Sequence, residues 1–211
     1  MFISDQGCLL RKSSSGENHL LMVFFLRQQG LKSALSRISR SLAMSSPKPD
    51  LFHSGSVLIE QRDEGKPAFL KDFQPEHLHR GIGLAYRSLA CASALSRFYE
   101  RNLLHLELFQ EAWILLHQAL AAFSLKPLPE ATLLKAFFLF ARSEGYPVTA
   151  QWLNAKPPQP RRDLTTILRS PPERVEASPH EVGFWIQDLE HYLRDQTELR
   201  PSDWKGLSPS A

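Results

Sequence analysis

Residues 20–38, LLMVFFLRQQGLKSALSRI, indicate the fold of the first third of the chain. Residues 20–26 are apolar without interruption, which predicts a strand buried on both faces. A second strand is predicted over residues 30–38, where apolar and polar positions alternate in part. The first third of the chain is therefore expected to form a β-sheet domain.

Working outward, three further short strands are predicted, at residues 8–10, 57–59 and 68–70. Turn residues separate them, with Ser13 to Gly16 after the first and Asp63 to Gly65 between the last two. Five short strands suit a small closed barrel, because closure removes exposed strand edges. An OB-like barrel fits the number of strands, although the sequence does not distinguish it from other small barrels. The first domain is assigned to residues 1–74.

The apolar period changes to that of helices near Pro75. Stripes with steps of three and four run from Leu78 to Ala92, from Leu106 to Phe123 and from Leu133 to Ala141. The predicted fold class is α+β, with a five-stranded N-terminal OB-like barrel followed by an all-helical domain at residues 75–200.

Proline then dominates, and an extended loop is expected over residues 146–162, with a short helical turn around residues 164–168. Ser178-Pro179-His180-Glu181 is a helix-start signal with a capping serine and a proline at the first helical position. The tail at residues 201–211 is short and polar, so it is expected to fray.

The positive charge is concentrated in the first third of the chain. Residues 1–72 hold 10 Lys and Arg against 7 Asp and Glu, whereas residues 73–211 hold 15 of each. Residues 18–49 hold five basic residues and no acidic one, and a field of that sign attracts polyanions. These five residues are the predicted DNA contacts: Arg27, Lys32, Arg37, Arg40 and Lys48.

Lys and Arg contact phosphates without reading bases, so the pattern favours binding without sequence specificity. Aromatic side chains near the basic segment are candidate stacking surfaces for unpaired bases, although each is more typical of a core. They are Phe24, Phe25, Phe52 and Phe69.

Signals for catalysis are weak. The chain has no phosphate-binding loop with lysine, no G-x-S-x-G and no H-E-x-x-H. Cys8 and Cys91 cannot by themselves build a four-ligand zinc site, and no histidine pair has ligand spacing. We therefore expect no enzyme activity, no metal and no cofactor. No segment reaches the roughly 20 apolar residues of a membrane span, and no secretory signal is visible, so a cytoplasmic protein is expected.

The order of these features resembles the RecO family of bacterial recombination mediators. Leu9-Leu10-Arg11, Gly16-Glu17-Asn18, the apolar strand to Leu26 and Gly30-Leu31 are similar to the family's opening. Residues 37–49 resemble its basic, serine-containing loop. Further landmarks are Ala85-Tyr86, Leu108-Phe109 and Gly145-Tyr146-Pro147. One departure is clear: many relatives carry a four-cysteine zinc knuckle after the last motif, and residues 148–162 contain no cysteine.

The resemblance implies a non-catalytic protein that binds single- and double-stranded DNA and anneals complementary strands. It implies two protein partners, a RecR-like protein and the single-strand-binding protein. With them it would help load the recombinase onto gapped DNA during repair, in a nucleoid-associated cytoplasmic location.

Two other interpretations stay open. The first is a basic barrel with a helical partner-binding domain used outside recombination, for example on RNA. The second is an interaction protein with no role on nucleic acid. Salt-sensitive DNA binding would separate the latter from the others, and strand annealing would identify the mediator.

Overall fold

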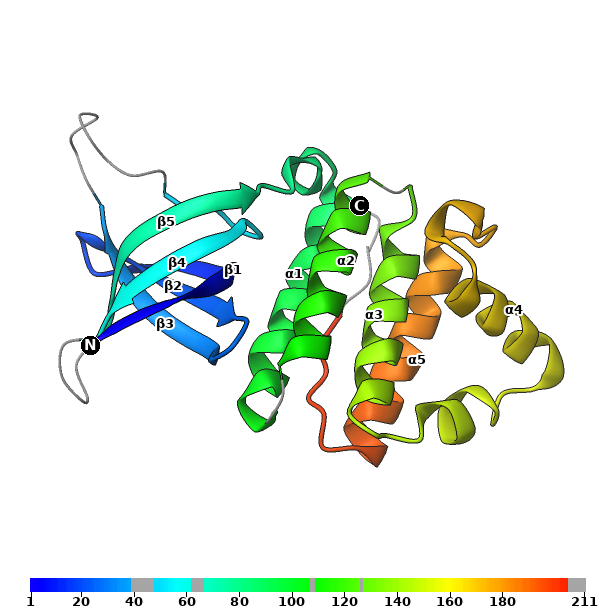
Figure 1. Ribbon diagram of the computed structural model, residues 1–211. Coiled ribbons are helices and arrows are strands. Elements are labelled where there is room, and N and C mark those ends of the chain that lie inside the picture. Colours follow the sequence, from blue (N-terminus) through cyan, green and yellow to red (C-terminus); the bar gives the residue numbers. More distant parts are fainter. Residues whose placement is uncertain (39–47, 62–66, 107–108, 126, 205–211) are drawn as a thin grey trace. The chain divides into compact units, whose positions relative to one another are not determined.

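The computed structural model describes residues 1–38, 48–61, 67–106, 109–125 and 127–204. Five strands come first and helices follow, so the α+β class and the order of its two parts are confirmed (Figure 1). The strands are β1 (Phe2–Ser15), β2 (His19–Leu26), β3 (Gly30–Arg37), β4 (Ser54–Glu60) and β5 (Phe69–His77). Their bounds exceed the sequence prediction most in β1, because Ser13 to Ser15 pair with β2 instead of forming a turn. The predicted turn at residues 63–65 lies outside the described residues.

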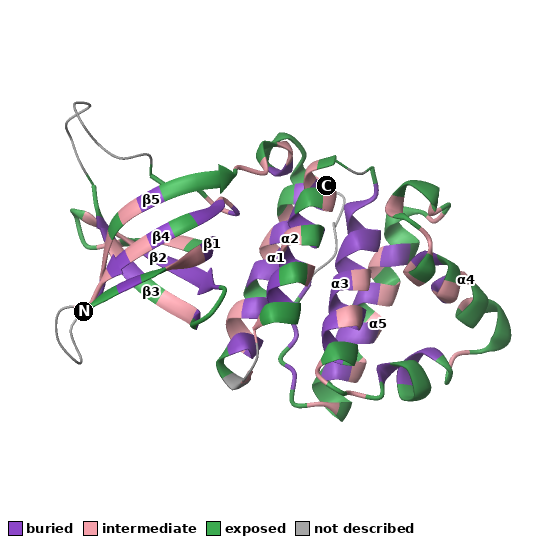
Figure 2. Ribbon diagram, viewed as in Figure 1, coloured by how far each residue is buried: buried purple, intermediate pink, exposed green. Residues whose placement is uncertain are grey.

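The strands are hydrogen-bonded in the order β1-β2-β3-β5-β4, and β4 pairs back onto β1, which closes the barrel. The long β1 is antiparallel to both neighbours, whereas β3 and β5 run parallel, with Leu35 opposite Phe69. Alternate residues point inward and form a core that includes Met22, Phe24 and Phe73. The purple strand segments in Figure 2 show this burial.

The chain divides into two compact units. Unit 1 comprises residues 1–79 and 103–110, and unit 2 comprises residues 80–102 and 111–211. The boundary expected at residue 74 thus lies at residue 79, since β5 continues to His77. Sequence periodicity gave no sign that the segment at 103–110 returns to unit 1. There Phe109 contacts the ring of Phe25, at 6.1 Å between centroids.

The helices of unit 2 pack around a central, mostly buried α3. Phe98 of α1 lies 4.6 Å from Phe137 of α3, centroid to centroid. The long helices are α1 (Tyr86–Asn102), α2 (Gln110–Leu125), α3 (Pro129–Ser143), α4 (Pro158–Arg169) and α5 (Pro179–Gln196). Short helical turns span Arg80–Leu84, Leu103–His105, Thr149–Leu153 and Pro172–Arg174.

The first helical stripe began too early in the sequence prediction. Residues 80–84 form a 3-10 turn, and α1 begins only at Tyr86. Glycine is needed in this turn, because a Cβ at Gly81 would lie 2.2 Å from the carbonyl oxygen of Ser124. Two glycines in five residues also disfavour an α-helix.

The expectation of an extended loop over residues 146–162 was wrong. Thr149–Leu153 is a π-helical turn, and α4 already begins at Pro158. Proline is tolerated in the first turn of a helix, because the backbone N–H groups there have no intrahelical partner. Prolines 158 and 160 therefore start a helix instead of preventing one.

Residues 201–204 are ordered by buried contacts, which corrects the prediction of a frayed tail. Glu190 of α5 is 3% exposed and accepts hydrogen bonds from Ser202 N (2.7 Å), Ser202 Oγ (2.5 Å) and Trp204 N (3.0 Å). Residues 205–211 lie outside the described residues. The start of α5 agrees with the sequence signal, since Ser178 Oγ accepts from Glu181 N at 3.1 Å.

Candidate nucleic-acid interface

The predicted DNA contacts fall at opposite ends of β3. Arg27 lies in the turn before the strand and Lys32 near its start, whereas Arg37 is its last residue. Seven strand steps separate Gly30 from Arg37, or about 23 Å. Arg40 lies outside the described residues, and Lys48 follows that gap. The five residues therefore do not form one cluster.

Arg27 and Lys32 belong to the end of the barrel that unit 1 closes with its segment 103–110. Arg27 Nε donates to Gln110 Oε1 at 3.1 Å. Lys32 is half-buried, pairs in register with Phe24 and shares the inward face of β3 with Ala34. At the same end, a Cβ on Gly30 would come within 2.6 Å of the Phe109 ring. Arg27 is thus hydrogen-bonded within unit 1 and Lys32 lies on the inward face of β3, so neither joins Arg37 at the other end of the strand.

Arg37 and Lys48 meet at the other end. Lys48 Nζ donates to the carbonyl oxygen of Arg37 at 2.9 Å, and both side chains are exposed. His19 stands opposite Arg37 in the β2–β3 register, on the outward face. Three nitrogen-bearing side chains are thus gathered at the end of one strand.

Phe69 is the aromatic residue of this end. Its ring centroid lies 6.2 Å from that of His19, with the planes at 68°. Of the four phenylalanines considered as stacking surfaces, Phe24, Phe25 and Phe52 are at most 3% exposed, whereas Phe69 is half-buried. The register with Leu35 places Phe69 on the outward face of the barrel.

Lys71 completes the group. It is exposed and lies two residues beyond Phe69 in β5, at the point where the β4–β5 register shifts. Lys71 Nζ also lies 2.9 Å from Glu60 Oε2, which offsets that carboxylate. We call His19, Arg37, Lys48, Phe69 and Lys71 the β3 patch.

Sequence reasoning missed His19 and Lys71. Lys71 lies outside the acid-free segment, and histidine was not counted as basic. The alternation Phe69-Leu70-Lys71 was the available signal, because it places an aromatic ring and a cation on one face of a strand.

The net positive charge of unit 1 is smaller than that of residues 1–72. Unit 1 also contains Glu76 and Glu107, so it carries 10 basic and 9 acidic residues. The positive character is local to the β3 patch and is not a property of the whole unit.

The two thiols lack nucleophilic character. Cys8 and Cys91 are both buried and unpaired. Burial raises the pKa of Cys8 to about 12 and that of Cys91 above its ordinary value, so neither is a thiolate at neutral pH. Over the described ranges, no group of three or more His, Cys, Asp or Glu side chains is placed to hold a metal ion.

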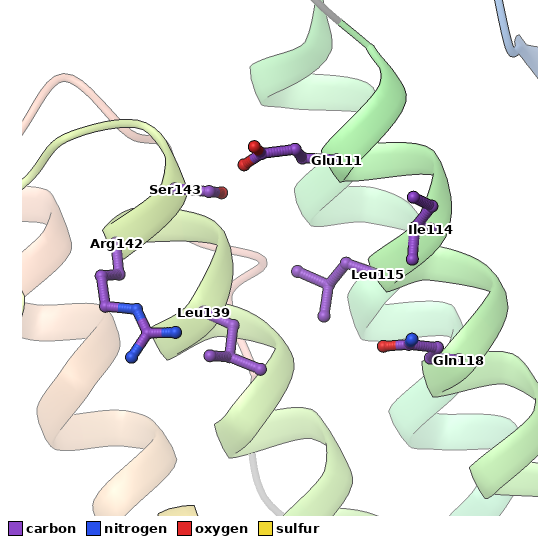
Figure 3. A pocket seen from close by; sticks show the side chains of 7 residues that line it. All are labelled: Glu111, Ile114, Leu115, Gln118, Leu139, Arg142 and Ser143. Carbon is purple, nitrogen blue, oxygen red and sulfur yellow. The ribbon is translucent and has the colours of Figure 1, made fainter.

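Unit 2 carries a separate groove of about 350 Å³ between α2 and α3. Figure 3 shows Leu115 of α2 and Leu139 of α3 pointing toward one another across it. Glu111, Gln118, Arg142 and Ser143 surround this apolar floor, and Ile114 on the rim is 45% exposed.

Comparison with protein-family models and with curated proteins finds no match for this chain. In the part of the chain that the structure describes, no helix is long and apolar enough to cross a membrane.

Proposed function

We propose that this protein is a non-catalytic DNA-binding protein whose barrel contacts the phosphate backbone through the β3 patch. The observation that carries the proposal is the gathering of Arg37, Lys48 and His19 at the end of β3, with His19 in ring contact with the half-buried Phe69. Cations of this kind hold phosphates without reading sequence, so single- and double-stranded DNA would both bind.

The barrel supports an OB-like identity. Its order β1-β2-β3-β5-β4, with a long β1 paired on both sides, suits a five-stranded barrel of that type. OB-folds bind oligonucleotides on the face of strands 2 and 3 and on adjoining loops. His19 and Arg37 lie on that face of this chain.

We further propose that the protein acts as a RecO-like recombination mediator in DNA repair. The support is the resemblance of the sequence motifs, together with a barrel followed by helices. In this role the protein anneals complementary strands and helps load the recombinase onto gapped DNA in the nucleoid. Its partners are a RecR-like protein and the single-strand-binding protein.

The absence of cysteine from residues 148–162 does not conflict with this role. In this chain Trp152 Nε1 donates to Asp188 Oδ2 at 2.7 Å, and Lys156 Nζ lies 2.5 Å from the same oxygen. Lys156 also lies 5.5 Å from the Trp152 ring centroid. These contacts tie the segment to α5 without a metal ligand.

The test combines binding and annealing by the intact chain. Fluorescence anisotropy with an oligonucleotide across a salt series should give a slope of log affinity against log salt near ~−2, at about −0.7 for each of three phosphate contacts on a single strand. Fluorescent complementary strands should anneal faster when the protein is added. Absence of salt-sensitive binding would overturn the DNA role. Binding without annealing would instead favour the alternative, a nucleic-acid module outside recombination, and RNA should then compete.

A further inference from the structure

We infer that the chain after α5 occupies a peptide-docking groove of unit 2, and that a partner protein binds there with an extended segment of the same chemistry. The occupying segment is residues 200–204, which have no regular secondary structure. In Figure 1 it belongs to the red stretch that follows α5. The groove is separate from the proposed DNA site, because every residue that forms it lies in unit 2.

Side chains of α1 hold this segment by its backbone. Asn102 Nδ2 donates to the carbonyl oxygen of Arg200 at 2.9 Å, and Asn102 Oδ1 accepts from Arg200 N at 2.8 Å. Arg97 Nε donates to the carbonyl oxygen of Ser202 at 3.2 Å. Main-chain hydrogen bonds of this kind give affinity for an extended peptide whatever its sequence.

Three successive side chains of the segment supply the specificity. Ser202 Oγ donates to Glu190 Oε1 at 2.5 Å. Asp203 Oδ2 accepts from Arg101 at 2.5 Å, and Trp204 is only 7% exposed. The groove therefore suits a hydroxyl group, a carboxylate and an aromatic ring in that order, and a partner segment should carry the same order.

The hollow beside the segment leaves room for a second peptide to approach. It measures about 550 Å³ and is lined by one face of α1 and by residues 202–204. Tyr86 and Leu89 of α1 line it and are 76% and 37% exposed, and the nearby Leu84 is 88% exposed. These apolar side chains form an exposed patch that a partner can contact while residues 200–204 are still in place.

Two features make the internal segment a replaceable occupant. Asp203 has a φ of 58°, in the left-handed region that residues other than glycine rarely adopt. The indole Nε1 of Trp204 is buried and has no hydrogen-bond partner among the described residues, which costs free energy. A partner segment can still satisfy the carboxylate of Glu190, because two of its three donors are backbone N–H groups.

The occupant is assigned to a different protein and not to a second copy of this chain. A tethered segment competes at an effective concentration in the millimolar range, so each copy fills its own groove first. Only a segment with better contacts displaces it.

The experiment uses a fluorescein-labelled peptide with the sequence of residues 197–204, TELRPSDW, titrated by anisotropy against the intact chain. The receptors are the parent and the double variant Asp203→Ala with Trp204→Ala, which keeps every side chain that α1 and α5 contribute to the groove. The double variant should bind the peptide at least about tenfold more tightly than the parent, because apparent affinity scales with the fraction of molecules in which the site is open. A peptide with the same two substitutions should not bind.

A third substitution locates the peptide. Adding Arg101→Gln to the double variant should weaken peptide binding severalfold, because the carboxylate of the peptide loses its charged donor. Arg169→Gln is the matched control, since this arginine is exposed on α4 and does not line the groove. Circular dichroism checks that each variant is folded.

The possible results differ clearly. A folded double variant that does not bind the peptide overturns the inference, and so does equal binding by parent and variant. If the double variant does not fold, Asp203→Asn takes its place, because asparagine tolerates left-handed backbone and removes the charge that pairs with Arg101. Peptide affinity should then still rise above that of the parent, and no rise overturns the inference. Dimerisation of the parent that is lost in the variant would assign the groove to a second copy and overturn the assignment to a partner. DNA affinity should be the same in all variants, so these results do not depend on the proposed function.

Discussion

Arg37 and Lys48 meet through the backbone and not through their charges. The carbonyl oxygen of Arg37 accepts from Lys48 Nζ at 2.9 Å, so the lysine is anchored to the backbone of a residue whose own side chain is also exposed. This contact makes the two residues a pair.

Replacing Arg37 and Lys48 together with alanine should remove two phosphate contacts and flatten the salt slope by ~1.4. The loss of affinity should be similar for unrelated oligonucleotides, because phosphate contacts carry no base information. Anisotropy across a salt series measures both quantities. Arg162→Ala with Arg169→Ala is the control, since it removes the same charge from exposed positions of α4. A control that flattens the slope as much would move the interface away from the β3 patch.

His79 makes the stability of unit 1 sensitive to acid. Burial, and then the charges of His77 and His53, lower its pKa from 6.5 to about 4. Between pH 6.5 and 4 the unfolded chain binds a proton here that the folded chain does not. Stability must therefore fall as the pH drops through that window.

His79→Asn should weaken this pH dependence. Asparagine does not titrate, and it tolerates the left-handed backbone of this position, where φ is 44°. The measurement is the hydrogen-exchange protection of the β4 and β5 amides at pH 7 and pH 5, in the parent and the variant. His180→Asn, at the exposed start of α5, should behave as the parent does. An equal loss of protection in parent and His79→Asn would contradict the prediction.

At the scale of elements, the chain at the end of β3 and the chain after α5 are both held by hydrogen bonds to residues that are not their neighbours in sequence. β3 ends where Ile38 N donates to Asn18 O. The chain after α5 is fixed by the buried carboxylate of Glu190, which satisfies donors from Ser202 and Trp204. A buried carboxylate with three donors is stable only while those donors stay in place.

Glu190→Gln should destabilise unit 2 by about 2–4 kcal/mol, because one acceptor oxygen becomes an NH₂ group facing backbone donors. All four tryptophans lie in unit 2, so urea unfolding followed by tryptophan fluorescence reports on it directly. Glu198→Gln is the matched control at an exposed position. A midpoint unchanged from that of the parent would show that the tail contributes nothing to the stability of the unit.

At the scale of the whole molecule, unit 1 is built from two separate segments of the chain. Residues 80–102 belong to unit 2, residues 103–110 return to the barrel, and α2 then continues unit 2. Phe25 is fully buried beside Phe109. A fragment that ends at residue 79 would lack Phe109 and would leave the Phe25 ring without this contact. DNA binding is therefore best mapped on the intact chain.

Photo-crosslinking of the intact chain to a thiothymidine oligonucleotide should label peptides from residues 1–79. The reason is that the β3 patch lies wholly within unit 1, whereas the groove between α2 and α3 lies in unit 2. Mass spectrometry of the digested complex identifies the labelled peptides. Labels confined to residues 111–204 would place the DNA on the helices and contradict the assignment.

A last prediction concerns the groove between α2 and α3 in unit 2. Its apolar floor and the exposed rim residue Ile114 suit a protein partner more than DNA. Under the proposed mediator role, with this groove as the docking site, Ile114→Glu should weaken binding of the single-strand-binding protein and leave the affinity for DNA unchanged. Leu125→Glu is the control, because Leu125 is 78% exposed at the end of α2 and does not line the groove. Equal loss with both variants would argue against the groove.

The sequence alone predicted the five strands, the helices α1, α2, α3 and α5, and the capping serine of α5. These features depend on neighbouring residues: apolar period, turn chemistry and local hydrogen bonding. It also predicted five basic contacts in one acid-free segment, of which the structure brings Arg37 and Lys48 together.

Only the tertiary structure decided which side chains share a surface. Phe69 is brought next to β3 by a parallel pairing with Leu35 that spans more than thirty residues of sequence. Arg27 and Lys32, although close to Arg37 in sequence, lie at the other end of an extended strand. Ser202 and Trp204 are held by a carboxylate twelve and fourteen residues away. The physical reason is that strand pairing and burial bring together residues whose separation along the chain carries no signal of their contact.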